Sequence, residues 1–381
     1  MHFFSKLRDK GDHFVITVYK EDRDRLNIFL KDLLILKINN NEIIRMVMKD
    51  FHVSLPKRLL ENQNHGDPIK IEILNISKMT ECVKRPKELF NNKLDLRYFI
   101  PKYTIHKKPI YIFERCENTY SVWYNIGGGV EPVTFRNNII LEELAELIGF
   151  YFGDGSTSNG ISSFRLTNSE PSVLNYCLNI LEKIGIQRSN FKIQIIYSTN
   201  KEITNEIQER CSIFWSNILK IKKENIVSVL KAKNIRETLT YGNARLFIDS
   251  TVLIEIFLHG ILKEVITRIT KPKDQVDIIL LKGFMRGLLA AEGSPVLNIN
   301  NSLVKVGISF DPHSSELELY KSLLKNLNIS YGKAQSNQLF IYSYKNMTEF
   351  SILDAFKMHN SRKEKFLIGY ANHKFSKNSI F

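Results

Sequence analysis

The sequence contains no apolar run that approaches the ~18 residues a membrane-spanning helix needs. Its first residues, Met1–Lys6, carry neither a long apolar stretch nor a small-residue cleavage site, so we expect no signal peptide. Cysteine is scarce and forms no Cys-x-x-Cys pair; the four residues are Cys82, Cys116, Cys177 and Cys211. This scarcity argues against zinc ribbons and disulfide scaffolds, and it favours a reducing intracellular location, cytoplasmic or organellar.

Positive charge is what the sequence has in excess. Lys and Arg number 54 against 40 Asp and Glu, which gives a formal net charge of +14 over 381 residues. Such an excess favours a polyanionic partner, most often nucleic acid, although a generally basic proteome would also produce it. Hydrophobic residues (43%) and charged residues (25%) occur in the proportions of a folded protein, and the length suits two or three domains.

Residues 1–135 are predicted to form a separate N-terminal α+β domain with an accessory role. Apolar residues at helical spacing over 42–49 predict one helix, and Ser54 is a suitable N-cap for a second. Together they outline a helix-turn-helix at 42–61, with Lys57 and Arg58 placed to contact DNA. Two unrelated short helices would give the same pattern.

Strand and turn signals follow in the same region. Residues 69–73 and 110–113 have the composition and alternation of strands. Gly127–Gly129 predicts a flexible turn and not a phosphate-binding loop, since no Gly-Lys-Ser/Thr follows it.

From about residue 136 onward one pattern occurs twice, which predicts two similar halves at 136–275 and 276–381. Each copy opens with an apolar helix that ends in an acid, a glycine and a serine, at residues 144–156 and 284–294. A strand, a helix and further strand are predicted after each, at 163–167, 172–184 and 191–196 in the first copy and at 304–310, 315–327 and 339–344 in the second.

Small residues recur four positions apart on one face of each repeated helix. They are Gly149 and Gly153 in the first copy, and Gly287 and Ala291 in the second. Small residues at this spacing let two helix backbones approach closely. We therefore expect the two helices to pack against each other, side by side and parallel, with these residues at the interface.

Parallel packing would bring Asp154 and Glu292 together at the C-terminal ends of their helices, where Gly155 and Gly293 are predicted C-cap glycines. A carboxylate there faces the negative end of the helix dipole, at a cost of roughly 0.3–1 kcal/mol, and two carboxylates repel each other. A divalent cation removes both penalties, and hard oxygen ligands suit Mg²⁺. Two carboxylates, Mg²⁺ and a basic surface suit phosphodiester hydrolysis. The alternative is two core helices that each end in an ordinary acid.

Residues 147–155 (LIGFYFGDG) and 285–293 (MRGLLAAEG) resemble the two motifs of single-chain LAGLIDADG homing endonucleases, archaeal-like members in particular. The resemblance extends over about 138–376 and does not cover the first 135 residues. It implies an α+β fold of two pseudo-symmetric αββαββα halves whose sheets form a DNA-binding saddle. It also implies a monomer that cleaves both strands of double-stranded DNA at a long, nearly asymmetric target, encoded in association with an intron.

Matched to the motifs, Asp154 and Glu292 occupy the last acidic positions and are the implied metal-binding and catalytic residues. Relatives often place a basic residue near the acids, and Arg165 and Lys305 are the candidates for this catalytic role. The candidate DNA-binding residues are Arg165, Lys192, Lys305 and Lys333 on the saddle, with Lys57 and Arg58 in the N-terminal domain. Each of these could instead be an ordinary solvated surface charge.

Two functions are open at this point. The leading one is a Mg²⁺-dependent, site-specific DNA endonuclease, and the presence of both acids favours it. The alternative is a LAGLIDADG-type protein that binds DNA or intron RNA without cutting it, as a regulator or a maturase. The additional N-terminal segment favours this alternative.

Overall fold

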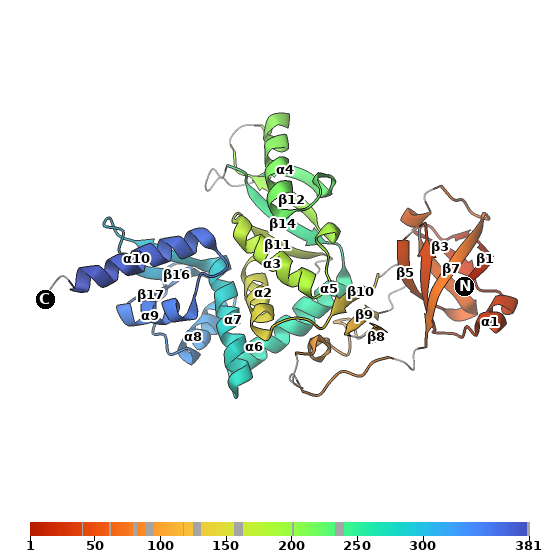
Figure 1. Cartoon of the computed structure of the whole chain (residues 1–381), viewed down its shortest axis with the longest axis horizontal. Helices are drawn as coiled ribbons and strands as arrows, with labels where there is room; N and C mark the ends of the chain where they lie inside the picture. Colours follow the sequence, from red (N-terminus) through yellow and green to blue (C-terminus); the bar gives the residue numbers. More distant parts are fainter. Residues whose placement is uncertain are drawn as a thin grey trace. The chain divides into compact units, whose positions relative to one another are not determined.

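The computed structural model describes residues 1–39, 41–60, 62–78, 82–88, 94–116, 118–124, 131–155, 163–199, 202–232 and 240–378, with side chains up to residue 373. Gly127–Gly129 and the motif residue Ser156 lie outside the described residues. Helices and strands are mixed along the chain (Figure 1), so the predicted α+β class is confirmed. No helix within the described ranges is long and apolar enough to cross a membrane.

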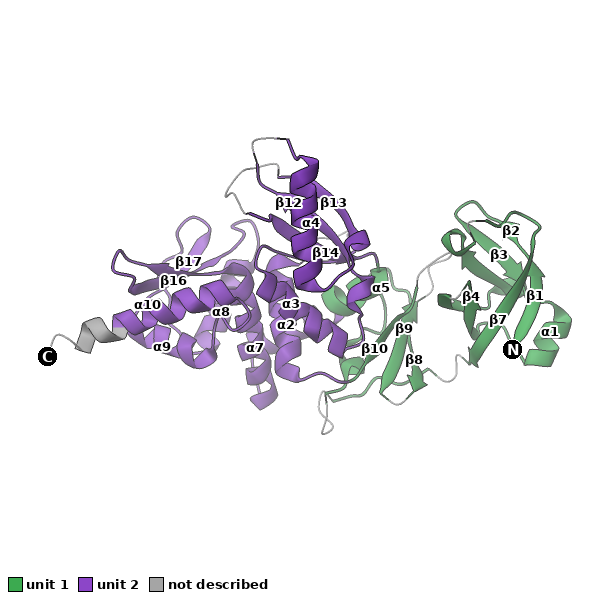
Figure 2. Ribbon diagram, turned by 45° about the horizontal axis from the view of Figure 1, so that its top comes forward, with its two compact units in different colours: residues 1–137, 250–259 green, residues 138–249, 260–381 purple. Residues whose placement is uncertain are grey.

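The chain forms two compact units, drawn in green and purple in Figure 2. Unit 1 contains Met1–Asn137 and Ser250–His259, and unit 2 contains Asn138–Asp249 and Gly260–Phe381. The segment Ser250–His259 includes helix α5 (Thr251–Ile256), which packs on strand β9 (Thr119–Tyr124) of unit 1. The sequence prediction had assigned this segment to the first repeat.

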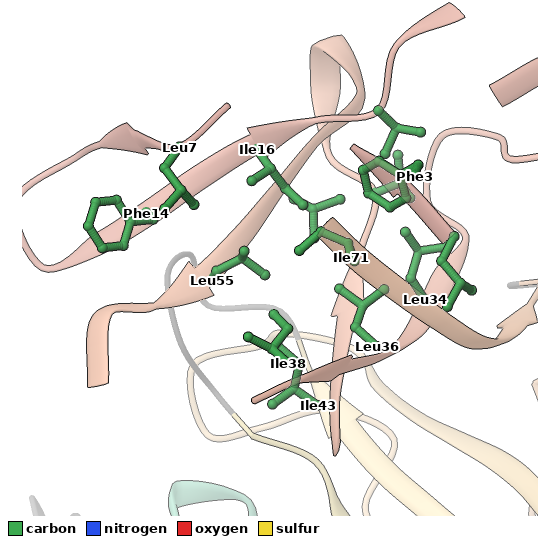
Figure 3. Packing of buried hydrophobic residues seen from close by; sticks show 14 of the residues in the cluster. Phe3, Leu7, Phe14, Ile16, Leu34, Leu36, Ile38, Ile43, Leu55 and Ile71 are labelled. Atoms are coloured by element: carbon green, nitrogen blue, oxygen red, sulfur yellow. The ribbon is translucent and has the colours of Figure 1, made fainter. Parts of the chain in front are cut away.

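The first part of unit 1 consists of two small antiparallel sheets that share one core. One sheet has the order β1-β7-β4-β5, and the other has the order β2-β3-β6. The elements are β1 (His2–Lys6), β2 (Arg8–Asp9), β3 (His13–Thr17), α1 (Lys20–Leu26), β4 (Leu33–Ile38), β5 (Asn41–Met46), β6 (His52–Pro56) and β7 (Pro68–Ser77). Phe3, Ile16, Leu36, Leu55 and Ile71 from five of these strands are buried together between the sheets (Figure 3).

A third sheet of unit 1, with the order β10-β9-β8, packs on the first through a second apolar cluster. Its other strands are β8 (Ile110–Cys116) and β10 (Val133–Arg136). Phe113 and Trp123 of this sheet lie in one cluster with Ile35 of β4 and Ile44 of β5. Strands β4 and β5 are therefore apolar on both faces. The strands predicted at 69–73 and 110–113 correspond to β7 and β8 and are confirmed.

The predicted helix-turn-helix at residues 42–61 is wrong. The described part of this segment forms β5, a 3-10 turn at Lys49–Phe51, β6 and a second 3-10 turn at Lys57–Leu59. Because β5 is buried on both faces, its apolar residues do not show the two-residue alternation of a half-exposed strand, and they matched helical spacing by chance. Ser54 is a residue of β6 and caps no helix.

Lys57 and Arg58 therefore have no recognition helix to present them to DNA. Lys57 Nζ lies 2.7 Å from Asp9 Oδ2, and the Arg58 guanidinium pairs with Glu131. Both cations are thus engaged with acids of unit 1. The prediction of a DNA-binding arm loses its structural basis.

Unit 2 is built around two long helices that carry the repeated motifs, α2 (Leu141–Asp154) and α7 (Gln275–Glu292). The first repeat continues with β11 (Phe164–Asn168), α3 (Pro171–Lys183), β12 (Lys192–Tyr197), α4 (Asn205–Leu219), β13 (Ile226–Lys231) and β14 (Asn243–Ile248). Helix α6 (Lys263–Thr270) leads to α7, which is followed by β15 (Gly293–Leu297), β16 (Leu303–Ser309), α8 (Glu316–Asn326), β17 (Gln338–Ile341), α9 (Tyr344–Leu353) and α10 (Asn360–Asn378).

Local sequence signals set the starts of the helices in unit 2. Asp274 caps α7 by accepting a hydrogen bond of 2.9 Å from the backbone N–H of Asp277. Pro171 begins α3, at a position where the helix needs no backbone donor. Glu142 and Glu143 lie in the first turn of α2, at the positive end of its dipole.

Each repeat contributes one sheet. The first has the order β11-β14-β12-β13, and the second has three described strands in the order β15-β16-β17. Two four-stranded sheets were predicted, so the second sheet is one strand short within the described ranges. Helices α2 and α3 contact β11, and Leu166, Ile195 and Leu246 of the first sheet are fully buried. The neighbouring residue on each of these strands is part-exposed, so the opposite face of the sheet is open.

Candidate active site

Helices α2 and α7 touch backbone to backbone. A Cβ atom placed on Gly149 would lie 2.0 Å from the carbonyl oxygen of Phe284. A Cβ atom on Gly287 would lie 1.9 Å from the carbonyl oxygen of Glu146. Non-bonded atoms in a packed interior do not approach so closely, so only glycine fits at these two positions.

The two helices run parallel. Beyond the contact of Gly149, a Cβ atom on Gly153 would lie 2.6 Å from the Cβ atom of Ala291 and 3.2 Å from the Cγ atom of Glu292. The contacts therefore advance in the same direction along both helices. Asp154 and Glu292, the last residues of α2 and α7, lie at the same end of the pair.

The glycines that follow the two acids differ from the prediction in their conformation. They end the helices, but with φ of −97° at Gly155 and −77° at Gly293, neither adopts the left-handed conformation of a C-cap glycine. The two glycines are explained instead by the lack of space for a side chain. A Cβ atom would lie 2.1 Å from the Tyr151 carbonyl oxygen at Gly155, and 2.6 Å from the Leu289 carbonyl oxygen at Gly293. The chain therefore returns tightly against the last turn of each helix.

The surroundings of the acid pair disfavour negative charge. Burial raises the pKa of Asp154 from 3.8 to about 7, with Asn168 and Arg362 opposing the rise. Burial, followed by the charges of Asp154 and Glu316, raises the pKa of Glu292 from 4.5 to about 7, again with Arg362 opposing. Both side chains keep part of their solvent exposure, so an ion can reach the pair from outside.

Two further residues act at this end of the helix pair. Asn168 Nδ2 donates to Asp154 Oδ2 at 2.6 Å and fixes the orientation of that carboxylate. Arg362, in the first turn of α10, donates through Nη1 to three last-turn carbonyl oxygens of α7, those of Ala290 (2.7 Å), Ala291 (3.0 Å) and Leu289 (3.3 Å). A cation at a helix C-terminus is favourable because it offsets the negative end of the dipole.

The first repeat holds the start of α10 in place. Ser361 Oγ donates to Glu170 Oε2 at 2.7 Å, and the backbone N–H of Asn360 donates to Ser172 Oγ at 3.1 Å. Glu170 and Ser172 lie at the N-terminal end of α3. Both repeats therefore determine where Arg362 lies relative to the acid pair.

A buried ionic network crosses the helix interface away from the acid pair. Glu146 of α2 is fully buried, and its carboxylate accepts hydrogen bonds from Arg286 Nε at 2.5 Å and from Lys357 Nζ at 3.1 Å. Tyr176 donates to the same carboxylate, and Glu142 pairs with Arg286 as well. Since these groups are all engaged with one another, the network is a structural link and not a reactive site.

The acid pair fits a divalent cation such as Mg²⁺. Its donors are hard carboxylate oxygens, and a cation would relieve both the burial of their charge and their repulsion. Among the described residues, no group of three His, Cys, Asp or Glu side chains is arranged to hold a metal. Asp154 and Glu292 would therefore supply the protein side-chain ligands, and water or phosphate oxygens would complete the set.

In the first sheet, two of the predicted basic residues lie on the open face. Arg165 of β11 donates through Nε to Ser163 Oγ at 2.6 Å, and Lys192 Nζ of β12 lies 3.0 Å from Asp249 Oδ2. The positive charge that acts on both carboxylates comes from Arg362 and not from Arg165. The catalytic role predicted for Arg165 gains no support from this placement.

In the second sheet, Lys305 of β16 extends over a ring, with its Nζ 3.6 Å from the centroid of Phe340. Lys333 is exposed in the loop between α8 and β17. Their predicted roles in DNA binding stay predictions.

The sequence reasoning missed Asn168 and Arg362 as site residues. Both lie within the range 138–376 over which the sequence resembles the LAGLIDADG homing endonucleases, and outside its two motifs. Nothing in their spacing from the motifs indicates contact with the acid pair, because strand β11 and the start of α10 reach it only through tertiary packing.

No protein-family model and no curated protein matches the chain. Several solved structures do. The N-terminal LAGLIDADG domain of DUF199/WhiA shares 18% identity over 57% of this chain and 84% of that chain, with a TM-score of 0.31. Full-length DUF199/WhiA from Thermatoga maritima shares 17% identity over 63% of this chain and 67% of that chain, with a TM-score of 0.33. A mesophilic variant of the homing endonuclease I-DmoI shares 15% identity over 55% of this chain and 87% of that chain, with a TM-score of 0.31. Scores this low leave the geometry of the chain itself as the evidence for its function.

Proposed function

We propose that this chain is a Mg²⁺-dependent, site-specific endonuclease of the LAGLIDADG type that cleaves double-stranded DNA. The observation that carries the proposal is the convergence of Asp154 and Glu292 at one end of a tightly packed parallel helix pair. Both acids lie where their negative charge is unfavourable without a cation. The excess of Lys and Arg over Asp and Glu suits a polyanionic substrate.

In this proposal Asp154 and Glu292 hold the cation through their carboxylate oxygens. When bound, Mg²⁺ activates a water molecule and stabilises the leaving oxygen of the phosphodiester. Asn168 orients one carboxylate, and Arg362 fixes the end of α7. The spacing of the two acids is set by helix packing and does not depend on a flexible loop. Lys and Arg side chains of unit 2 supply the phosphate contacts.

One copy of the chain contains both acids, so we propose that it acts as a monomer. The two repeats differ in sequence and in the number of described strands, so they present different surfaces to the two halves of a target. A long and nearly asymmetric DNA site follows from this difference. An intracellular, DNA-associated location follows from the activity.

A second candidate is sequence-specific DNA binding without cleavage. The observation that favours it is the donor set, since among the described residues no three His, Cys, Asp or Glu side chains are arranged to hold a metal. Arg362 also offsets part of the charge of the pair without any metal. In this alternative Asp154 and Glu292 are residues of the helix interface without a catalytic role.

One experiment separates the two functions. The full-length protein is incubated with a library of randomised DNA duplexes in Mg²⁺, in Ca²⁺ or in EDTA, and bound and cut molecules are sequenced separately. The endonuclease is supported by cut duplexes that appear in Mg²⁺ alone and share a consensus with the bound fraction. A bound consensus without cut products in Mg²⁺ or Mn²⁺ supports the non-cleaving candidate. Absence of enrichment under every condition contradicts both.

A further inference from the structure

A row of polar side chains crosses the open face of the first sheet in unit 2. Thr167, Arg245, Gln194 and Ser228 are successive register partners on β11, β14, β12 and β13. Neighbouring strands lie about 4.8 Å apart, so the row extends over about 14 Å. All four side chains are part-exposed, whereas Leu246, the residue after Arg245, is fully buried under the opposite face.

Hydrogen bonds within the row fix Arg245. Arg245 Nη1 donates to Gln194 Oε1 at 2.9 Å, and Gln194 Nε2 donates to Ser228 Oγ at 3.2 Å. The amide of Gln194 is therefore engaged at both its oxygen and its nitrogen, and its role is to hold the guanidinium. Arginine carries five N–H donors in a planar fork, and among the residues that the structure describes only Gln194 accepts from Arg245, which leaves most of the donors for a ligand.

A second arginine lies beside the row. Arg165 is displaced by two positions along β11 from Thr167, the register partner of Arg245. Burial and then the charge of Arg165 lower the pKa of Arg245, so the two guanidinium groups act on each other. In the parts of the chain that the structure describes, neither arginine has a carboxylate partner, whereas Lys192 on the same face is paired with Asp249. Two adjacent cations without an acid favour a ligand that offers several acceptors.

The second sheet offers different chemistry on the corresponding face. Its register places Ser294 opposite Gly307 and Gly307 opposite Phe340, and Lys305 extends over the Phe340 ring. No arginine occurs in β15, β16 or β17. The two sheets therefore cannot recognise the same ligand surface.

We infer that Arg245, positioned by Gln194, recognises guanine in the major groove of one half of a double-stranded DNA target. Guanine presents N7 and O6 as adjacent acceptors, which match the arginine fork, and the length of the row is comparable with the groove width of about 12 Å. Side chains cannot read the deep, narrow major groove of duplex RNA, so of the two duplexes DNA is the one that this row can read. The half of the target that faces the second sheet carries no arginine–guanine contact. This inference rests on the proposed DNA binding and is independent of cleavage.

The test is a selection from randomised DNA duplexes in EDTA with the full-length protein and three variants. The wild type should select a guanine at a fixed position in one half of its consensus. Arg245→Ala should lose that guanine and bind the wild-type site about 10- to 100-fold more weakly. Arg245→Lys should weaken the preference for guanine but keep the salt dependence of binding, because lysine retains the charge without the planar fork. Gln194→Leu should weaken the preference for guanine at the same position of the consensus.

Lys365→Ala, on the exposed side of α10, is the control, and it should leave the selected guanine in place. Thermal melting of each variant shows whether it folds, and Arg245→Lys tests the inference even if Arg245→Ala does not fold. A guanine that every folded Arg245 variant selects as strongly as the wild type overturns the inference and leaves DNA binding standing. A wild-type protein that enriches no sequence, or that prefers duplex RNA in competition, overturns the proposed function together with the inference.

Discussion

Asp154 and Glu292 show how far single residues can be interpreted from sequence. Their pairing was predictable, because the repeat placed each acid at the same position after helices with matching small residues. Their electrostatic environment was not predictable, because it depends on burial and on residues from other elements. Asn168 reaches Asp154 from β11, and Arg362 reaches the end of α7 from α10. Arg165 and Lys305, the basic residues predicted to assist the acids, were inferred from their strands and have no such contacts to support them.

The raised pKa values of the two acids predict a pH dependence of stability in the absence of divalent cations. Each carboxyl has a pKa of about 7 in the folded protein and near 4 when unfolded, so the folded state binds more protons between these values. Their contribution to stability is present below about pH 4 and is lost as the pH rises through about 7.

Urea unfolding in EDTA across this pH range measures the effect. The decline in the free energy of unfolding should be shallower in Asp154→Asn, because an amide does not titrate there. An identical pH profile in wild type and variant would contradict the assignment of the shift to this carboxyl. Addition of Mg²⁺ should stabilise the wild type most at the upper end of the range.

Arg362 should stabilise the C-terminal end of α7. Hydrogen bonds from a charged donor contribute about 1.5–3 kcal/mol, so Arg362→Met should lower the free energy of unfolding by about that amount. Arg362→Lys should recover only part of the loss, because an ammonium group lacks the planar fork. Chemical denaturation measures both, with Lys365→Met on the exposed side of the same helix as control. Equal losses in the Arg362 and Lys365 variants would show that Arg362 does not cap the helix.

The helices and strands differ in how well their structure could be predicted from sequence. The parallel pairing of α2 and α7 followed from small residues four apart, since close backbone contact admits little else, and the structure shows this pairing. The helix-turn-helix prediction for residues 42–61 was wrong for a physical reason. A strand buried on both faces loses its alternation, and its apolar run then fits a helix equally well. Helix α5 belongs to unit 1 and not, as predicted, to the first repeat, because it packs on β9.

The ionic network between α2 and α7 leads to a prediction for the helix interface. Glu146→Leu leaves the buried Arg286 with one partner fewer, and Arg286→Met leaves the fully buried Glu146 short of its closest cation. Breaking a buried pair typically costs about 3–5 kcal/mol, whereas replacing both partners by apolar residues is often neutral.

A double-mutant cycle tests this expectation. The double variant Glu146→Leu with Arg286→Met should be more stable than either single variant, as measured by the free energy of unfolding. Additive losses would mean that the two side chains do not interact across the interface.

At the scale of the whole molecule, the first two sheets of unit 1 differ in net charge from the rest of the chain. Residues 1–77 contain 13 Lys and Arg against 11 Asp and Glu, so the net positive charge resides almost entirely in residues 78–381. The sequence placed a domain boundary near 135, and unit 1 ends its first segment at Asn137. Total charge could not show this distribution. It becomes visible only when residues 1–77 are known to form the two sheets β1-β7-β4-β5 and β2-β3-β6.

The double variant Lys57→Ala with Arg58→Ala should therefore leave DNA binding unchanged. Both side chains are already paired with acids, and each phosphate contact that is lost would lower the salt slope of log K by about 0.9. Affinity measured over a series of salt concentrations gives the slope, with Arg165→Ala on the open sheet as the comparison that should reduce it. A reduced slope in the Lys57 and Arg58 variant would restore the N-terminal region as a DNA-binding arm.

If Asp154 and Glu292 form a carboxylate pair that supports DNA cleavage, removing either charge should abolish cleavage and leave DNA binding intact. The most direct measurement is the single-turnover rate at which the wild type, Asp154→Asn and Glu292→Gln cut a library-selected duplex in Mg²⁺, alongside their affinities for that duplex in Ca²⁺. Both variants should bind with affinities close to that of the wild type, because phosphate contacts come from Lys and Arg, and neither should produce detectable cleavage. Cleavage at the wild-type rate by either variant would contradict this role of the pair.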